Sequence, residues 1–210
     1  MTTSPLIWIV VLVAVGLLPF ISVMLTSFVK MAVVLSIIRS AVGAPQVPPN
    51  SVVTGLALIL SMVVMAPVAS EVAEKFKRGE KVFYYGSLKE ISRAFNRAVK
   101  PIERFLIRNT NQKHINKFSQ TLGSSGVNNK IDWKILILAF VISQLEEAFQ
   151  MGFVIFLPFL VVDMLIGSIL LSLGMHMLSP TAVSLPFKLL LFVFADGWTL
   201  VGTSLIGTYR

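Results

Sequence analysis

The stretch that decides the fold runs from Ile135 to Leu173 and reads ILILAFVISQLEEAFQMGFVIFLPFLVVDMLIGSILLSL. As one α-helix it would be nearly twice as long as the roughly 30 Å hydrocarbon core of a bilayer, which about 20 residues cross. Pro158 stands near its middle, where a helix is expected to kink. Glu146, Glu147 and Asp163 place charge within this apolar sequence. The stretch predicts a long, Pro-kinked helix in an integral membrane protein.

The composition agrees with a membrane protein and excludes several kinds of site. Of the 210 residues, 55% are hydrophobic and 13% are charged, which is far from the usual balance of a soluble domain. The chain has no cysteine, so it has no disulfide framework and no thiolate metal site. Its two histidines, His114 and His176, stand far apart, and no catalytic motif is present. The sequence therefore predicts neither an enzyme, nor a metal site, nor a cofactor.

Four apolar regions set the expected architecture. They are Leu6 to about Ile38, Val52–Ala69, Ile135–Leu173 and Ala182–Ile206. The second and fourth have the length of ordinary spans, whereas Leu6–Gly43 as one helix would be about 57 Å long and contains Pro19 as an expected kink. The opening residues lack the basic region and the cleavage site of a secretory signal, so we expect them to be a retained helix. The predicted fold is an all-α membrane protein with two long Pro-kinked helical hairpins and a small helical subdomain between them.

The central segment carries all of the net charge. Residues 70–134 hold fourteen Lys and Arg against six Asp and Glu, a balance of +8, and the rest of the chain is neutral. Within it, SLKEISRAFNRAVKPIERFLIRN has helical amphipathic spacing, and TLGSSGVNNK is a polar linker. This predicts three parts: a first hairpin (1–69), a basic, amphipathic helical segment (70–134) and a second hairpin (135–210). The segment lacks interleaved aromatic residues on its basic face, so we expect no nucleic-acid partner.

Charges inside the apolar regions are the first candidate functional residues. Besides the three acidic residues quoted above, they are Lys30, Lys188 and Asp196. A central Asp or Lys costs about 2.5–3.5 kcal/mol on insertion scales, so such groups are expected to face protein or water. Counted from the turn, Asp163 and Asp196 come out at the same depth, and Lys188 lies about 12 Å along the helix from Asp196, too far for a direct pair. Three roles stay open: ion pairs that fix the packing of helices or subunits, a proton relay, or charges along a water-filled conduit.

The connection between the last two apolar regions is the second candidate. It reads GMHMLSP, Gly174–Pro180, and places Met175 and Met177 on either side of His176. Turns usually contain glycine, proline and small polar residues, so two thioethers are unusual here. On its own this stretch is typical of a packed hairpin tip.

Several blocks of the sequence resemble one family. They are LLPFISVMLTSFVKMAVVLSIIRSAVGAPQVPPNSVVTGLALILSMVVMAPV in the first half, and EEAFQMGF, LPFLVVD and PFKLLLFVFADGW in the second. Together they are similar to the FliP/SctR family (HrcR, YscR and SpaP in other systems), inner-membrane subunits of the type III secretion and flagellar export apparatus. The resemblance implies a non-enzymatic role as part of the entry conduit for unfolded export substrates.

The resemblance also implies partners and a location. Family members form a pentameric ring and join SctT-like and SctS-like subunits, next to export gate components and inner rod or needle proteins. The chain is then expected to be a multi-pass protein of the bacterial inner membrane, with residues 71–134 and most of the complex on the periplasmic side. Flagellar relatives usually carry a longer N-terminus with a signal peptide, so the short start here favours a virulence-type or symbiosis-type system.

Carried over residue by residue, the family's methionine-rich pore gasket falls on Met175, His176 and Met177. Its central charges fall on Asp163, Lys188 and Asp196. Its first turn falls on the four residues Gln46, Pro48, Pro49 and Asn50. Many relatives have methionine where this chain has His176 and glutamine where it has Pro45, so a pH-sensitive constriction and a tolerated substitution both stay open.

Two other functions compete with the conduit. A proton- or ion-coupled small-solute transporter would use Asp163 and Asp196 as its coupling site. A membrane anchor would use the basic segment to bind anionic lipid.

Overall fold

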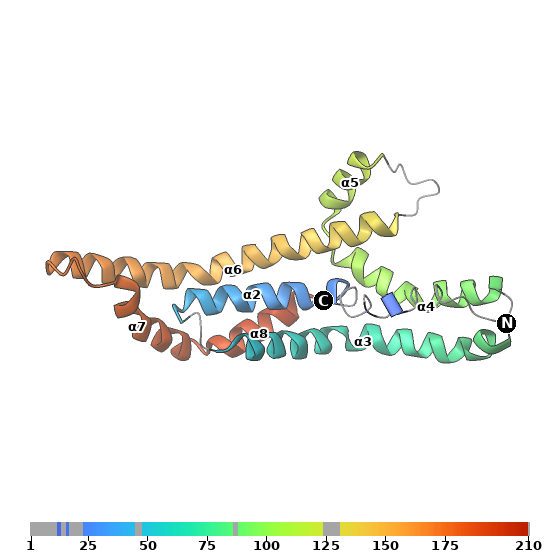
Figure 1. Ribbon diagram of the computed structural model, residues 1–210, viewed down its shortest axis with the longest axis horizontal. Helices are drawn as coiled ribbons and strands as arrows, with labels where there is room; N and C mark the ends of the chain where they lie inside the picture. The colour runs from blue at the N-terminus through green and yellow to red at the C-terminus, as the bar shows by residue number, and fades with distance from the viewer. Residues whose placement is uncertain are drawn as a thin grey trace. The chain divides into compact units, whose positions relative to one another are not determined.

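The computed structural model describes residues 12–13, 16, 23–44, 48–85, 88–123 and 131–209, with the backbone alone at 78–85, 88–93 and 95. Every regular element in these residues is an α-helix, so the predicted all-α class is confirmed (Figure 1). The helices are α2 (Phe28–Ala41), α3 (Asn50–Tyr85), α4 (Leu88–Arg108), α5 (Gln112–Thr121), α6 (Trp133–Ser172), α7 (Pro180–Phe194) and α8 (Gly197–Gly207).

Two of the described helices are long and apolar enough to cross a membrane. They are α3, over Asn50–Lys77, and the whole of α6. The bent pair α7 and α8 would make a third span if it crosses as one unit. These helices support a membrane protein. The arrangement of four apolar regions in two hairpins stays a prediction, since most of residues 1–22 lie outside the described residues.

Prolines inside these helices do not end them. Helix α6 continues through Pro158 as one helix of 40 residues, and α4 continues through Pro101. A proline removes one backbone hydrogen bond, and in a long apolar helix the remaining bonds hold the element together. Pro19, the other expected kink, lies outside the described residues.

The chain folds into two compact units. Unit 1 contains the residues before Lys30 and Met65–Ser143, and unit 2 contains Lys30–Val64 and Gln144–Arg210. Both α3 and α6 therefore contribute residues to each unit. The three-part division made from the sequence stays a prediction.

In unit 1, the amphipathic α4 packs through its apolar side. Ala98 and Leu106 are fully buried, and the rings of Phe105 and Phe140 lie 6.0 Å apart, centroid to centroid, which joins α4 to the first turns of α6. The backbone N–H of Asn111, which caps α5, donates to Ser143 Oγ at 2.9 Å. These contacts bury the start of α6 under α4 and α5.

In unit 2, α2 contacts both α6 and the end of α8. Its buried face is formed by Met31, Val34, Leu35 and Ile38. Gly152 of α6 lies so close to α2 that an added Cβ would come within 2.4 Å of Ile37 Cδ1. The sequence places glycine where two helices approach most closely, as membrane helix interfaces prefer.

A glycine and two prolines determine where α2 ends and where α3 begins. Gly43 ends α2 with φ +84°, a conformation that glycine adopts without strain, and its N–H donates to Ser40 O at 3.1 Å. Pro48 and Pro49 come directly before Asn50, the first residue of α3, and the Arg39 guanidinium donates to Asn50 Oδ1. Gln46 lies outside the described residues.

The fourth apolar region differs from its expected form. Instead of one helix over Ala182–Ile206, α7 and α8 meet at an angle of 61°. Asp196 between them adopts the left-handed conformation, with φ 48° and ψ 47°. Aspartate tolerates this conformation better than most residues, and Asp-Gly dipeptides favour turns. The sequence ADG at 195–197 is therefore the physical reason that the expectation of one helix is wrong.

Candidate functional site

The α6–α7 loop is positioned by a glycine at its start and a proline at its end. Gly174 has φ +72°, its N–H donates to Leu171 O at 3.1 Å, and Met175 N–H donates to Leu170 O at 2.9 Å. This pair of bonds is the Schellman arrangement that ends a helix. Pro180 begins α7, where its missing N–H and fixed φ suit the first turn.

The side chains of this loop project away from the rest of the chain. Met177 is 100% exposed and Met175 45% exposed, and His176 is also exposed. Burial of these apolar side chains against a partner would be favourable. A thioether is soft and unbranched, and it packs against partners of many shapes.

A network of polar contacts ties α6 to α7 below the loop. Lys188 Nζ lies 2.6 Å from Asp163 Oδ2, and Ser184 Oγ donates to the other oxygen of the same carboxylate. Lys188 is only 3% exposed, and Ser184 is fully buried. Gly43, after the end of α2, approaches the same ammonium: an added Cβ there would lie 3.6 Å from Lys188 Nζ. A buried ammonium needs such a counter-charge, because burying it unpaired is strongly unfavourable.

The structure brings Asp163 and Lys188 together and leaves Asp196 apart. Asp196 is exposed at the bend between α7 and α8, and its side chain makes no capping hydrogen bond. The expected equal depth of Asp163 and Asp196 stays a prediction. The counter-charge of Lys188 thus comes from another helix of the same chain.

A second buried charge, Lys30 of α2, has its own set of partners. It is 1% exposed, and its ammonium pairs with Glu147 of α6. It lies 3.5 Å from Thr208 Oγ1, and 4.2 Å from the centre of the Tyr209 ring, a cation–π distance. Glu147 keeps 42% of its side chain exposed, and neighbouring Glu146 is exposed.

Tyr209 completes this cluster through its hydroxyl. It donates to Gln144 Oε1, and Gln144 is fully buried. Burial, and after it the negative charge of Glu147, raise the pKa of the Tyr209 phenol above its ordinary value, so the hydroxyl stays protonated and can donate. Gln144, Ser184, Thr208 and Tyr209 were not predicted as site residues from the sequence. Of these, Gln144 alone could have been suggested by its spacing, since it lies three residues from Glu147 on one helix face.

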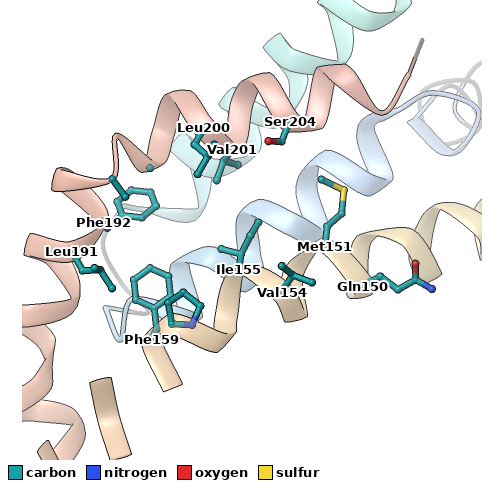
Figure 2. Close-up of a pocket in the computed structure, with 13 residues that line it drawn as sticks. Gln150, Met151, Val154, Ile155, Phe159, Leu191, Phe192, Leu200, Val201 and Ser204 are labelled. Carbon is teal, nitrogen blue, oxygen red and sulfur yellow. The ribbon is translucent and has the colours of Figure 1, made fainter. Parts of the chain in front are cut away.

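A cavity of about 620 Å³ lies where α7 and α8 bend away from α6. Figure 2 shows Phe159 and Leu191 toward one end, and Gln150 and Ser204 toward the other. The lining is otherwise apolar and comprises Met151, Val154, Ile155, Pro158, Phe192, Ala195, Gly197, Leu200 and Val201. The described residues include no cluster of three His, Cys, Asp or Glu that could hold a metal ion. In the described residues, the arrangement offers apolar surface and buried ion pairs.

Comparison with known proteins identifies the family. Residues 11–205 match the FliP family. The chain belongs to the FliP family. The resemblance predicted from the sequence blocks is thereby confirmed.

Relatives come from both secretion and flagellar systems. The virulence protein YscR of Salmonella typhimurium is 42% identical over 98% of this chain and 97% of its own length. The Yop proteins translocation protein R of Yersinia pestis is 41% identical, over 96% of this chain and 94% of its own length. The flagellar biosynthetic protein FliP of Buchnera aphidicola is 38% identical over 98% of this chain, which spans 56% of that longer protein. These FliP-family relatives support a role in type III secretion or flagellar export.

Proposed function

We propose that this chain is a core subunit of a type III secretion export apparatus, where it forms the entry conduit for unfolded substrates across the bacterial inner membrane. Membership of the FliP family, over 195 of the 210 residues (205 − 11 + 1), is the observation that carries the proposal. The similarity to virulence and translocation proteins supports the assignment to a secretion system. Copies of the chain would form the ring, pentameric as in the family, together with SctT-like and SctS-like subunits.

The geometry of the α6–α7 loop supports a constriction. In a ring of copies, loops that project from each subunit can meet on the axis, and Met175 and Met177 would then form a soft apolar seal with His176 between them. Such a seal blocks ions because it offers them no polar partner. It also deforms around a passing polypeptide of any sequence, because methionine changes rotamer easily.

The buried ion pairs support a rigid subunit around that loop. Asp163 and Lys188 hold α6 and α7 together, and Lys30 and Glu147 hold α2 against α6. The transporter alternative has less support, since Asp163 is engaged by Lys188 and Ser184 and Asp196 lies on an exposed bend.

The seal is tested by removing the two thioethers together. In the complex assembled with its partner subunits, Met175→Ala with Met177→Ala should raise ion leak across the membrane severalfold, because alanine side chains are too short to close the constriction. Leak is measured as ion flux into vesicles that contain the purified complex.

The matched control removes two other exposed methionines. Met62 on α3 and Met164 on α6 are 67% and 62% exposed but lie outside the loop, so Met62→Ala with Met164→Ala should leave the leak unchanged. An assembled loop variant with wild-type leak, or a control variant that leaks as much, would rule out the seal.

A further inference from the structure

A stripe of basic side chains follows one side of α4. The basic stripe consists of Lys100, Arg104 and Arg108, which are one helical turn apart and all exposed. Arg104 pairs with Glu71 of α3 and still exposes 65% of its side chain. Among the described residues, Lys100 and Arg108 have no acidic partner. The stripe therefore carries uncompensated positive charge on the surface of unit 1.

The pairing of Arg104 with Glu71 fixes the level of the stripe along α3. Helix α3 ends at Tyr85 and α4 begins at Leu88, so the two helices are joined by a short connection. Glu71 lies 14 residues before the end of α3 (85 − 71), and Arg104 lies 16 residues after the start of α4 (104 − 88). Two helices that meet at nearly equal distances from a short connection run antiparallel, as Figure 1 also shows. Arg108 is then farther along α3 toward its N-terminus than Glu71, and Lys100 is farther toward its C-terminus.

The sequence of α3 shows where this helix leaves the hydrocarbon. Residues 50–70 contain no charged side chain, and the first charge after them is Glu71. This apolar stretch of 21 residues (70 − 50 + 1) has the length of one membrane crossing. We expect the boundary between acyl chains and headgroups to lie near its end at Ser70.

The basic stripe straddles that boundary. Arg104 lies at the level of Glu71. Arg108 is then up to about 6 Å nearer the hydrocarbon and Lys100 up to about 6 Å farther from it, because four residues of a helix rise by about 6 Å along its axis. The headgroup layer on each side of a bilayer is roughly 5–8 Å deep. Long basic side chains at this depth extend along apolar surface and place their charge among the headgroups.

We propose that the basic stripe of the membrane-inserted subunit binds the phosphates of anionic phospholipids before the subunit is built into the larger complex. The planar guanidinium groups of Arg104 and Arg108 suit phosphate, which they can contact with two parallel hydrogen bonds. Lys100 adds a third charge at the outer edge of the layer. Binding would hold α4 at the membrane surface on the side where α3 emerges. The proposal rests on the membrane position of α3 and is independent of the conduit role.

The test measures lipid preference of the full chain purified without partner subunits. The chain is placed in nanodiscs of phosphatidylcholine and phosphatidylglycerol in equal parts, and the relative association of spin-labelled versions of the two lipids is compared. The wild type should prefer phosphatidylglycerol, and less so in high salt, because salt screens exposed charges. Lys100→Gln with Arg108→Gln should reduce that preference roughly thirtyfold, since each of the two basic residues near the surface contributes about 1 kcal/mol and about 1.4 kcal/mol corresponds to a factor of ten.

Two further variants separate a local site from general attraction. Lys113→Gln with Lys117→Gln, on exposed positions of α5, removes the same amount of charge and should keep the preference. Lys100→Arg with Arg108→Lys keeps the charge at the stripe and should also keep it. Equal losses in the α4 and α5 variants would overturn the proposal in favour of overall charge. A wild type without any preference would overturn it too, and would assign the stripe to an acidic protein surface.

Discussion

At the residue scale, the contact between Asp163 and Lys188 is the most constrained feature of unit 2. The ammonium is almost fully buried, and its carboxylate partner also accepts a hydrogen bond from Ser184. A buried pair adds little to stability compared with apolar residues of the same volume, but removing one partner leaves a buried charge uncompensated. The pair therefore acts mainly by fixing how α7 lies against α6.

Neutralising the carboxylate of this pair should destabilise the subunit strongly. Asp163→Asn is expected to lower the free energy of unfolding by about 3–5 kcal/mol, because Lys188 loses its counter-charge in a buried place. Denaturant titration of the purified chain in detergent, followed by circular dichroism, measures the change. Asp196→Asn is the matched control: Asp196 is exposed, and asparagine tolerates its left-handed backbone, so the effect should stay within about 0.5 kcal/mol. Equal effects of the two substitutions would show that the pair does not hold the helices.

The sequence identified the charges inside the apolar regions but not their partners. Lys30, Glu147, Asp163 and Lys188 stand out because charge is rare in apolar sequence. Which carboxylate meets which ammonium depends on the register of helices that are distant in the chain, and one sequence does not contain that register. Neutral partners such as Gln144 and Tyr209 give no compositional signal at all.

At the element scale, the bend between α7 and α8 shapes the cavity of unit 2. Gly197 begins α8 against the ring of Phe192, and an added Cβ would lie 2.3 Å from Phe192 Cε2. The ring of Trp198 also meets Phe192 edge to face, with centroids 5.1 Å apart. The rings leave no room for a side chain at 197, so glycine and the left-handed Asp196 together determine the bend.

Adding one methyl group to this glycine should disturb the bend. Gly197→Ala is expected to lower the free energy of unfolding by about 1–3 kcal/mol, the usual effect of overpacking, because the buried ring of Phe192 has to move. Gly202→Ala in the same helix is the control, since its added Cβ would come no closer than 4.0 Å to Leu60 and alanine favours a helix by up to about 1 kcal/mol. Thermal unfolding of both variants measures the difference. A Gly197→Ala variant as stable as Gly202→Ala would contradict the tight packing.

Sequence periodicity and the length of apolar runs were sufficient to predict that the helices exist, but not where they break. Helix α6 and the apolar part of α3 follow directly from long apolar runs, and α4 follows from its amphipathic spacing. The break at Asp196 was missed because the apolar runs before and after the short Asp-Gly turn look like one continuous helix in the sequence. The same limit applies to the prolines, whose effect on a helix depends on the neighbours that pack around it.

At the scale of the whole chain, several large apolar side chains are exposed on α6 and α7. Phe149 and Phe153 on α6 and Phe194 on α7 are 61%, 64% and 79% exposed. Lipid can cover such side chains, and so can a neighbouring subunit. Because Lys30 and Lys188 already have partners within the chain, assembly would rest on this apolar surface and on the methionine loop.

The mass of the complex tests the central proposal most directly. The chain is purified in mild detergent after co-expression with its SctT-like and SctS-like partners, and its mass is measured by native mass spectrometry. The proposed role predicts a stable complex that contains several copies of this chain, five by the family resemblance, together with both partners. A chain that remains a monomer and carries neither partner would contradict the role as a conduit subunit.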